Sequence, residues 1–333
     1  MTDTHQPLGS QPLSPQRLDS ETVDMLRSSL RHVLTASSDA PLGARLAELG
    51  WDDVVDQDAS TALRMLFEMR GETLSTADAL GPALGQHLLR LAGSSAVSLA
   101  NVVVALPSPF GTSVADGAQL QVDAMLTSPG AERIALAVGG RLAVCSVAAL
   151  SVDPIESLEH NAGWTRVHGT VAAADVMWAD GIAWTDIVAH GRWLLACELV
   201  GIGRHVIAEA VEYTKQRVQY GKAIGSFQAL QHRLAAAHSM VVGAGHLARE
   251  AGDDGDGWTA LIAKCMAGQA AEFACTQAQQ CYGAIGFTWE HEFHRYLRRT
   301  YTLDRLLGDW RSLEHEIGAR LQQSGQVPRI GRL

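Results

Sequence analysis

The chain has 333 residues, of which 47% are hydrophobic, and a formal net charge of −10. This length and composition allow several domains with a sizeable core and exclude a chain that is disordered throughout. The negative charge excludes a nonspecific nucleic-acid-binding protein, because no basic stripe is present to neutralise phosphates.

Residues 1–20 are rich in Ser, Pro, Gln and Thr, which predicts a mobile tail. They lack the charged and then apolar pattern of a signal peptide, and no apolar run in the chain reaches the roughly 18 residues of a membrane span. The cysteines form no CxxC pair, so we expect reduced thiols. Together these features predict a soluble, cytoplasmic protein that binds no membrane.

Residues 21–92 have the pattern of several short helices. Leu26, Leu30 and Val33 recur at helical spacing, and so do the apolar residues between Ala62 and Met69. We therefore expect an N-terminal helical domain.

Between residues 93 and 180 the pattern changes to short apolar or alternating runs, such as Ile134, Leu136 and Val138. Asp-Gly, Ser-Pro-Gly and Gly-Gly turn signals separate these runs at a spacing of roughly ten residues. This pattern predicts a small middle domain built from an antiparallel sheet or a barrel.

Residues 181–333 are again helical in pattern. A wide apolar stripe from Leu195 to Ala210 indicates a helix packed on more than one side, as in a bundle. Further helices are expected after Gln228, over residues 258–282 and over about residues 290–306. The predicted fold class is α+β, mainly α, with a C-terminal four-helix bundle.

Two short motifs have ordinary structural interpretations. Gly201-Ile202-Gly203 begins like a dinucleotide fingerprint, but no strand precedes it, so we interpret it as close helix packing. His291 and His294 could share a helix face, but no third ligand is spaced to join them, so we expect no metal site.

The segment from Arg217 to Gln228 can bind an anion. An arginine at a helix end, beside the turn framed by Gly221 and Gly225, can offer a bidentate fork to a pyrophosphate. Tyr220 and Phe227 add flat apolar surface. The alternative is an ordinary helix–turn–helix in which the arginine complements the helix dipole. Both interpretations stay open on physical grounds.

This segment is similar to the acyl-CoA dehydrogenase pattern R-x-x-F-G-x-x-I-x-x-F-Q, with Tyr220 in place of the first Phe. A second stretch, residues 280–299, resembles the family's Q-x-x-G-G-x-G-[FY]-T followed by R-x-x-R, with Ala284 at the second Gly. Arg192 also matches a family arginine. The resemblance implies contacts to the FAD of a neighbouring subunit. The residues that it places there are Arg217, Tyr220, Phe227, Gln228, Gln280 and Gly283.

The resemblance also implies the reaction: α,β-desaturation of an acyl-CoA thioester, with FAD as the hydride acceptor and a carboxylate as the base. In the family the base usually precedes a Gly, and that position falls on Leu307. A minority of members carry it at the head of the long helix, which falls on Gly191. Neither residue can accept a proton.

Glu198 is the candidate base that remains. It lies in an apolar stretch of the long helix, where burial raises a carboxyl pKa, and the alternative is a buried glutamate paired with an arginine. Glu290 and Glu292 are further candidates, but they lie among residues expected to face solvent or the cofactor's tail.

The family's flavin signature T-E-P-x-x-G-S-D is also absent, and residues 107–113 occupy its place without matching it. The resemblance is to short subunits that act on bulky or steroid-derived acyl groups. We therefore expect a homo- or hetero-oligomeric acyl-CoA dehydrogenase subunit. The alternatives are a non-catalytic subunit that completes a partner's FAD site, and a relative with another reaction on a CoA thioester.

Overall fold

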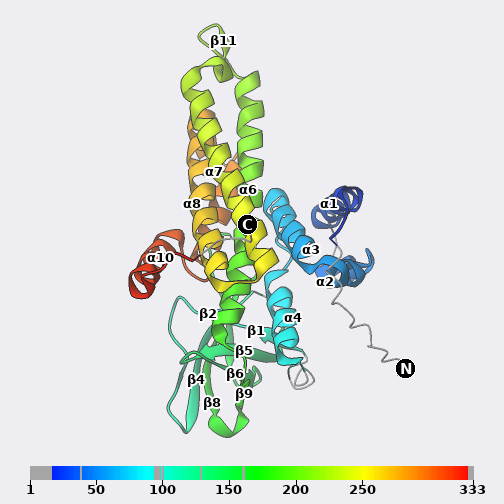
Figure 1. Ribbon diagram of the computed structural model, residues 1–333, viewed down its shortest axis with the longest axis vertical. Helices are drawn as coiled ribbons and strands as arrows, with labels where there is room; N and C mark the ends of the chain where they lie inside the picture. Colours follow the sequence, from blue (N-terminus) through cyan, green and yellow to red (C-terminus); the bar gives the residue numbers. More distant parts are fainter. Residues whose placement is uncertain are drawn as a thin grey trace, which may run out of the picture.

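The computed structural model describes residues 17–328, except 38–39, 94–98, 100, 128–129 and 160–161. Helices form most of the molecule (Figure 1). Three long helices stand side by side at one end, two small β-sheets lie at the other, and the N-terminal helices pack against the middle of the long ones. The mainly α fold predicted from the sequence is confirmed.

The long bundle consists of α6, α7 and α8, which run up, down and up (Figure 1). The alternation of direction follows from short connections, and a tight hairpin joins the first two helices. A shorter helix, α9, matches the fourth predicted helix, and α10 follows it, which the periodicity did not reveal. Their bounds are Trp184–Gln216 (α6), Gln228–Asp254 (α7), Gly257–Tyr282 (α8), Phe293–Arg305 (α9) and Trp310–Ser324 (α10).

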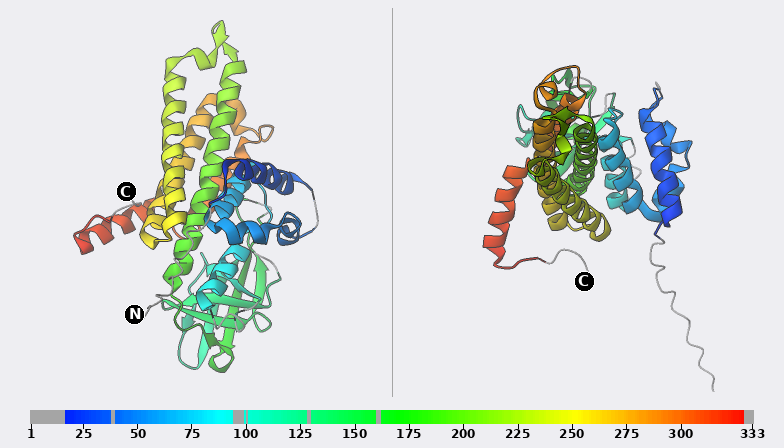
Figure 2. Two further views of the ribbon diagram at one scale, coloured as in Figure 1. Left: turned by 45° about the vertical axis from the view of Figure 1, so that its right-hand side comes forward. Right: turned by 90° about the horizontal axis from the view of Figure 1, so that it is seen from above.

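The N-terminal helices are α1 (Ser20–Thr35), α2 (Leu42–Ala47), α3 (Trp51–Thr73) and α4 (Leu80–Ala92). They lie on the side of the bundle opposite α10 (Figure 2). The expected mobile tail falls mostly on residues 1–16, outside the described residues. Its last residues differ from that expectation: Leu18 is buried and the Asp19 side chain accepts a hydrogen bond from the Thr22 amide, which caps α1.

The crossing of α3 and α6 confirms the interpretation of Gly201 as a packing residue. A Cβ at Gly201 would overlap the backbone of Glu68, and a Cβ at Gly71 would overlap the backbone of Glu198. Reciprocal glycines therefore allow the two helix backbones to touch. This close approach brings two buried glutamates, Glu68 and Glu198, to one crossing point.

The middle region forms two sheets, with strand orders β1-β5-β6-β9 and β2-β4-β8-β7, and β3 pairs with β4. Apolar residues of β4 and β8 pack against those of β5 and β6 as a core between the sheets. The described strand pairs are antiparallel except β1 with β5, which is parallel and which the sequence did not predict. The strands are β1 (Val102–Val104), β2 (Leu106–Pro107), β3 (Val114–Ala115), β4 (Gln119–Leu126), β5 (Arg133–Val138), β6 (Arg141–Ser146), β7 (Ser151–Pro154), β8 (Thr165–Ala172) and β9 (Met177–Trp178).

All five cysteines are free and buried. Within the described residues, no helix is both long and apolar enough to cross a membrane.

Candidate active site

A crevice of about 690 Å³ separates the sheets from the helices. One wall consists of the β2 end and the loop after it, including Ser108 and Phe110, together with Trp164. The other wall is formed by Arg192 of α6 and by the turn between α9 and α10. A volume of this size accommodates a small-molecule ligand, for which the usual range is ~300–1,000 Å³. The crevice is therefore the candidate active site.

The turn between α9 and α10 has an unusual backbone. Leu307 has a φ of 57° and Gly308 a φ of 106°, both in the region that favours glycine. The Leu307 side chain points at α6, where a Cβ added to Gly191 would stand 2.5 Å from Leu307 Cδ1 and 3.4 Å from Leu84 Cδ2. The two positions at which a base was sought thus lie against each other, and both are apolar.

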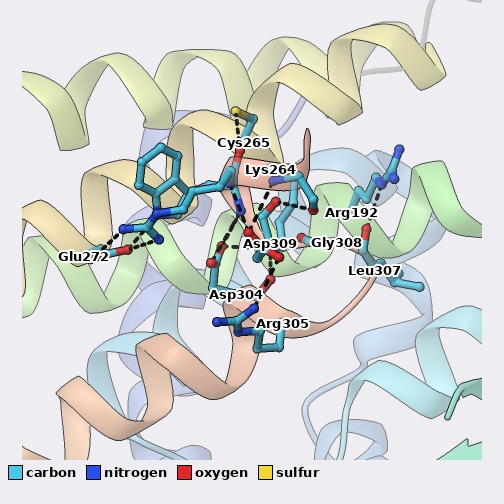
Figure 3. Close-up of polar contacts among 12 residues, drawn as sticks. Arg192, Lys264, Cys265, Glu272, Asp304, Arg305, Leu307, Gly308 and Asp309 are labelled. Carbon is cyan, nitrogen blue, oxygen red and sulfur yellow. Dashed lines mark hydrogen bonds and ion pairs between the residues drawn. The ribbon is translucent and has the colours of Figure 1, made fainter. Parts of the chain in front are cut away.

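The side chain of Lys264 on α8 holds this turn in place (Figure 3). Its side chain is completely buried, and Nζ donates to the carbonyl oxygens of Asp304 (3.0 Å) and Gly308 (3.2 Å) and lies 3.4 Å from Asp304 Oδ1. The Asp304 carboxylate accepts from the Trp310 amide, which begins α10. Burial lowers the pKa of Lys264, and the charge of Asp304 opposes that shift. The sequence analysis missed this pair, although a lysine inside an apolar helical run is a visible signal.

Arg192 holds the same turn from the side. Its Nε donates to the Leu307 carbonyl oxygen at 3.0 Å (Figure 3). Its terminal nitrogens donate to the carboxylate of Glu316 on α10. An arginine and a lysine from two long helices therefore fix the backbone of residues 304–308. The turn is a rigid wall of the crevice.

Glu198 is enclosed by arginines and lines no part of the crevice. Its Oε2 accepts from Arg70 Nη1 at 3.0 Å, and its Oε1 accepts from Arg299 Nε at 3.0 Å and from Arg299 Nη2. Arg299 also donates to Glu159 from the middle region at 2.6 Å. Glu198 has only 1% of its surface exposed. The buried arginine pairing, which was the alternative to a base, is the geometry observed.

The two other candidate carboxylates lie at the surface. Glu290 and Glu292 are exposed, and Glu292 accepts from Arg295 at 3.1 Å. Nothing in their contacts favours proton abstraction.

The residues of the segment from Arg217 to Gln228, which resembles the first family pattern, lie at the tip of the bundle. Arg217 caps α6, and the hairpin β10 (Val218–Gln219) and β11 (Lys222–Ala223) follows it. Tyr220 sits at the hairpin tip with 92% of its surface exposed and its ring edge-on to Phe227 at 6.2 Å. Gln228 begins α7 and is exposed. The structure thus brings Arg217, Tyr220, Phe227 and Gln228 together on one solvent-facing surface.

Residues 280–283, which begin the second stretch that resembles the family, lie at the same end of the bundle. Gln280 is exposed near the end of α8, and Gly283 ends that helix with a φ of 61°. Tyr282 between them packs edge-on against Tyr213, one turn before Arg217, with ring centroids 5.1 Å apart. Along α6, Arg217 is about 37 Å from Arg192 at the crevice, at ~1.5 Å per residue. One small molecule in this chain's crevice therefore cannot touch the bundle tip of the same chain.

Comparison with known proteins agrees with these motifs. The profile of the acyl-CoA dehydrogenase C-terminal domain matches residues 182–319, which hold α6 to α10. The acyl-CoA dehydrogenase IpdE2 of Mycobacterium tuberculosis is 28% identical, over 91% of this chain and 98% of that protein. Residues 182–319 of this chain therefore have the C-terminal domain of the acyl-CoA dehydrogenase family.

Solved acyl-CoA dehydrogenases have the same fold at lower identity. The ChsE4–ChsE5 complex from M. tuberculosis superposes with a TM-score of 0.74 at 16% identity, covering 94% of this chain and 99% of that one. The Tcur3481–Tcur3483 steroid acyl-CoA dehydrogenase (G363A variant) gives 0.71 at 20% identity, with 92% and 99% covered. Members of the family are flavoproteins. In this chain, Gly191 and Leu307, the two positions to which the resemblance assigns a base, are apolar and lie in contact.

Proposed function

We propose that this chain is a subunit of an FAD-dependent acyl-CoA dehydrogenase, and that it takes part in the α,β-desaturation of a CoA thioester without supplying the base. The observation that carries the second half of this proposal is the contact between Gly191 and Leu307.

The crevice has the chemistry that a flavin requires. Phe110 and Trp164 offer flat apolar surface, and Ser108 offers a hydroxyl. Arg192 lies at the opposite wall, where its guanidinium is paired with Glu316. When bound, FAD supplies the acceptor for the hydride that leaves Cβ of the acyl group. This chain's residues would orient the acyl group and exclude water from it, because the walls at Leu306, Leu307 and Leu313 are aliphatic.

The adenosine end of FAD would be held by the tip of a different subunit. Arg217, Tyr220, Phe227, Gln228, Gln280 and Gly283 share one end of the bundle, about 37 Å from the crevice along a helix that rises ~1.5 Å per residue. Exposed aromatic and arginine side chains suit stacking on adenine and pairing with a pyrophosphate. The site therefore requires an oligomer, and each subunit would complete the cofactor site of another.

Glu198 fits a structural role better than a catalytic one. A base must reach the proton that it removes, at about 3 Å between heavy atoms. The Glu198 carboxylate faces Arg70 and Arg299 and lines only a pocket of about 20 Å³. We therefore infer that the base comes from a second, different acyl-CoA dehydrogenase subunit.

The substrate is proposed by analogy. The Tcur3481–Tcur3483 protein, which shares this fold, is a steroid acyl-CoA dehydrogenase named for two components. By this analogy, we propose that the substrate of this chain is a bulky or steroid-derived acyl-CoA. We also propose that the chain assembles with a different subunit.

The test is to purify this chain alone and after co-expression with a candidate partner, an acyl-CoA dehydrogenase subunit that has a glutamate at the position matching Leu307. We expect a colourless protein alone, and the visible bands of FAD in the complex. Anaerobic addition of butyryl-CoA, octanoyl-CoA and a steroid-ring acyl-CoA then reports flavin reduction by bleaching. Full flavin occupancy and bleaching by this chain alone would overturn the partner role.

Glu198→Gln tests the base within the same complex. If Glu198 has only a structural role, a folded Glu198→Gln complex should still show bleaching of its flavin when the substrate is added. Glu68→Gln is the matched control, because Glu68 is equally buried and pairs with Arg64 and Arg204. Loss of bleaching in Glu198→Gln alone, with flavin content and melting temperature equal to the control, would identify Glu198 as the base.

A further inference from the structure

A second cavity, of about 420 Å³, lies on the face of α6 that points away from the crevice. Val188 and Arg192 of α6 line the crevice, whereas Asp186 and His190 line this cavity. Residues two apart on a helix point ~200° from each other, so the two pairs face in opposite directions. In the described part of the chain, no residue lines both spaces. The cavity is therefore separate from the candidate active site.

The walls of this cavity are mainly apolar. Helices α3, α4 and α8 contribute Leu63, Leu91 and Ala260. The Trp193 ring of α6 adds flat apolar surface, since its indole nitrogen already donates to the Ala248 carbonyl oxygen at 2.8 Å. Leu91 is 41% exposed, so the apolar surface extends to the mouth of the cavity. An apolar side chain that entered the cavity would remove this surface from water.

The cavity carries no net charge. His87 and His190 line it with their rings stacked at 4.0 Å between centroids, and burial lowers their pKa values to about 4 and about 2, so both rings are neutral at neutral pH. The other ionisable residues that line it are Arg90 and Asp186, which are exposed and opposite in charge. An uncharged occupant therefore suits the cavity.

The N-terminal segment enters the fold at the rim of this cavity. The Leu18 amide donates to the Asp58 carboxylate at 3.4 Å, and Asp58 lies two residues before Ser60, which lines the cavity. Arg17 pairs with Asp253 at 2.9 Å, and the same carboxylate accepts from Ser60 Oγ at 3.1 Å. These contacts place residues 17 and 18 beside the cavity.

Residues 6–16 have a composition that suits these walls. Their sequence, Gln-Pro-Leu-Gly-Ser-Gln-Pro-Leu-Ser-Pro-Gln, contains no charged side chain and holds the triplet Gln-Pro-Leu twice. Each triplet has an apolar leucine after a proline, at Leu8 and Leu13. Proline restricts the backbone, so a segment of this kind loses less conformational entropy when it binds. Proline-rich segments also dock on apolar surfaces that contain aromatic rings.

The covalent connection at Arg17 favours this segment over a free molecule. Leu13 lies four residues before Arg17 and Leu8 lies nine, so an extended chain lets them reach about 14 Å and about 32 Å from it. Asp253, which binds Arg17, also binds a residue of the cavity wall, so both leucines can reach the cavity. A group held by so short a connection has an effective concentration in the millimolar range.

We propose that the N-terminal segment of this chain docks in this cavity, with Leu8 and Leu13 of the two Gln-Pro-Leu triplets as its apolar contacts. Docking would bury the exposed part of Leu91 and connect α4 to the ion pair at Asp253. The proposal does not depend on the proposed function, because this face of α6 points away from the crevice.

The test is paramagnetic broadening in the full chain. Ser10→Cys carries a nitroxide label between the two leucines, and the native thiols do not compete for the label because all five cysteines are buried. The methyl NMR signals of Leu63 and Ala260 report on the cavity. We expect them to lose most of their intensity beside the oxidised label and to recover it when the label is reduced. Unchanged intensity would overturn the proposal.

Two double variants of the labelled chain separate docking from the covalent connection alone. Leu8→Ser with Leu13→Ser removes the apolar contacts but keeps the label and Arg17, so the methyl signals should recover most of their intensity. Gln6→Ser with Gln11→Ser changes the same two triplets at polar positions and should keep the broadening. Equal broadening in the two double variants would mean that the connection alone brings the label close, and the proposal would be wrong.

Changes on the cavity side locate the contact. Leu91→Ser should reduce the broadening at Ala260, whereas Leu49→Ser, at a residue 37% exposed outside the cavity, should leave it unchanged. Melting temperatures establish that both variants are folded. Undiminished broadening in Leu91→Ser would place the segment elsewhere and reject the proposal.

A mixed sample tests whether the segment stays on its own chain. It combines nitroxide-labelled chains that give no methyl signals with unlabelled chains that do. We expect no broadening, because docking within one chain does not bring the label to another. Broadening of Leu63 and Ala260 in this sample would assign the contact to a second copy and overturn the proposal.

Discussion

The side chain of Leu307 packs against Gly191, and these are the two positions to which the family resemblance assigns a catalytic carboxylate. A Cβ on Gly191 would stand 2.5 Å from Leu307 Cδ1. The leucine side chain therefore fits only because residue 191 is a glycine. The two vacant base positions are therefore one packed contact.

Gly191→Ala should destabilise the protein by about 1–3 kcal/mol, because the new methyl group overpacks this contact. Leu307→Ala in the same chain should recover part of that loss, since it removes the atom in the way. Urea unfolding of the two single variants and the double variant measures the coupling. Gly243→Ala is the control: it meets open space within α7 and should be neutral or stabilising. Additive effects at 191 and 307 would contradict the contact.

Lys264→Met should cost about 3–5 kcal/mol of unfolding free energy, because it leaves the buried Asp304 carboxylate without its cation. Adding Asp304→Asn should restore part of the stability by removing the unpaired charge. Lys215→Met removes an exposed lysine paired with Glu212 and should change stability by less than about 1 kcal/mol. Equal losses in Lys264→Met and Lys215→Met would show that the buried pair does not hold the turn.

Gly71→Ala and Gly201→Ala should each prevent tight packing of α3 on α6, because the methyl group would overlap a backbone that cannot move aside cheaply. We expect a large drop in soluble yield and in melting temperature for both. Gly43→Ala, with open space around it, should behave like the parent. Normal melting of either crossing variant would refute the close approach.

Acid should destabilise the protein through His87 and His190. Their pKa values in the folded chain, about 4 and about 2, lie below the ordinary 6.5, so the unfolded chain binds more protons and stability falls as pH drops below 6.5. Melting temperatures from pH 7.5 to pH 5 should therefore decline less steeply in His87→Phe and His190→Phe. The exposed His232→Phe serves as the control. An unchanged slope in both variants would contradict the buried neutral pair.

Arg217→Ala should reduce the FAD content of the assembled protein without lowering the melting temperature of the FAD-free chain, because the side chain is exposed and proposed to bind the cofactor of another subunit. Flavin absorbance per chain after gel filtration measures this. Arg249→Ala, an exposed arginine on α7 away from the tip, should keep its flavin. Full occupancy in Arg217→Ala would argue against the flavin contact.

The sequence by itself determined the architecture and the family. Helical spacing predicted the buried face of α6 and the span of α8, and short alternating runs located the strands, since both patterns follow from local backbone geometry. The motifs of fixed spacing that begin at Arg217 and Gln280 are each continuous in sequence, so they too can be recognised without a tertiary structure. Gly201 was also interpreted correctly, because a glycine inside an apolar helix has few other uses.

Only the tertiary structure decided which residues meet across the chain. Glu198 pairs with Arg70 and Arg299, and these partners lie 128 and 101 residues away. Gly191 meets Leu307, and Lys264 meets Asp304, for the same reason: packing of helices distant in sequence sets these contacts, and no periodicity encodes them. The parallel pairing of β1 with β5 was likewise decided by the order of strands in space. Whether a buried carboxylate is a base or an ion-pair partner depends on what surrounds it, so that question belongs to the folded chain.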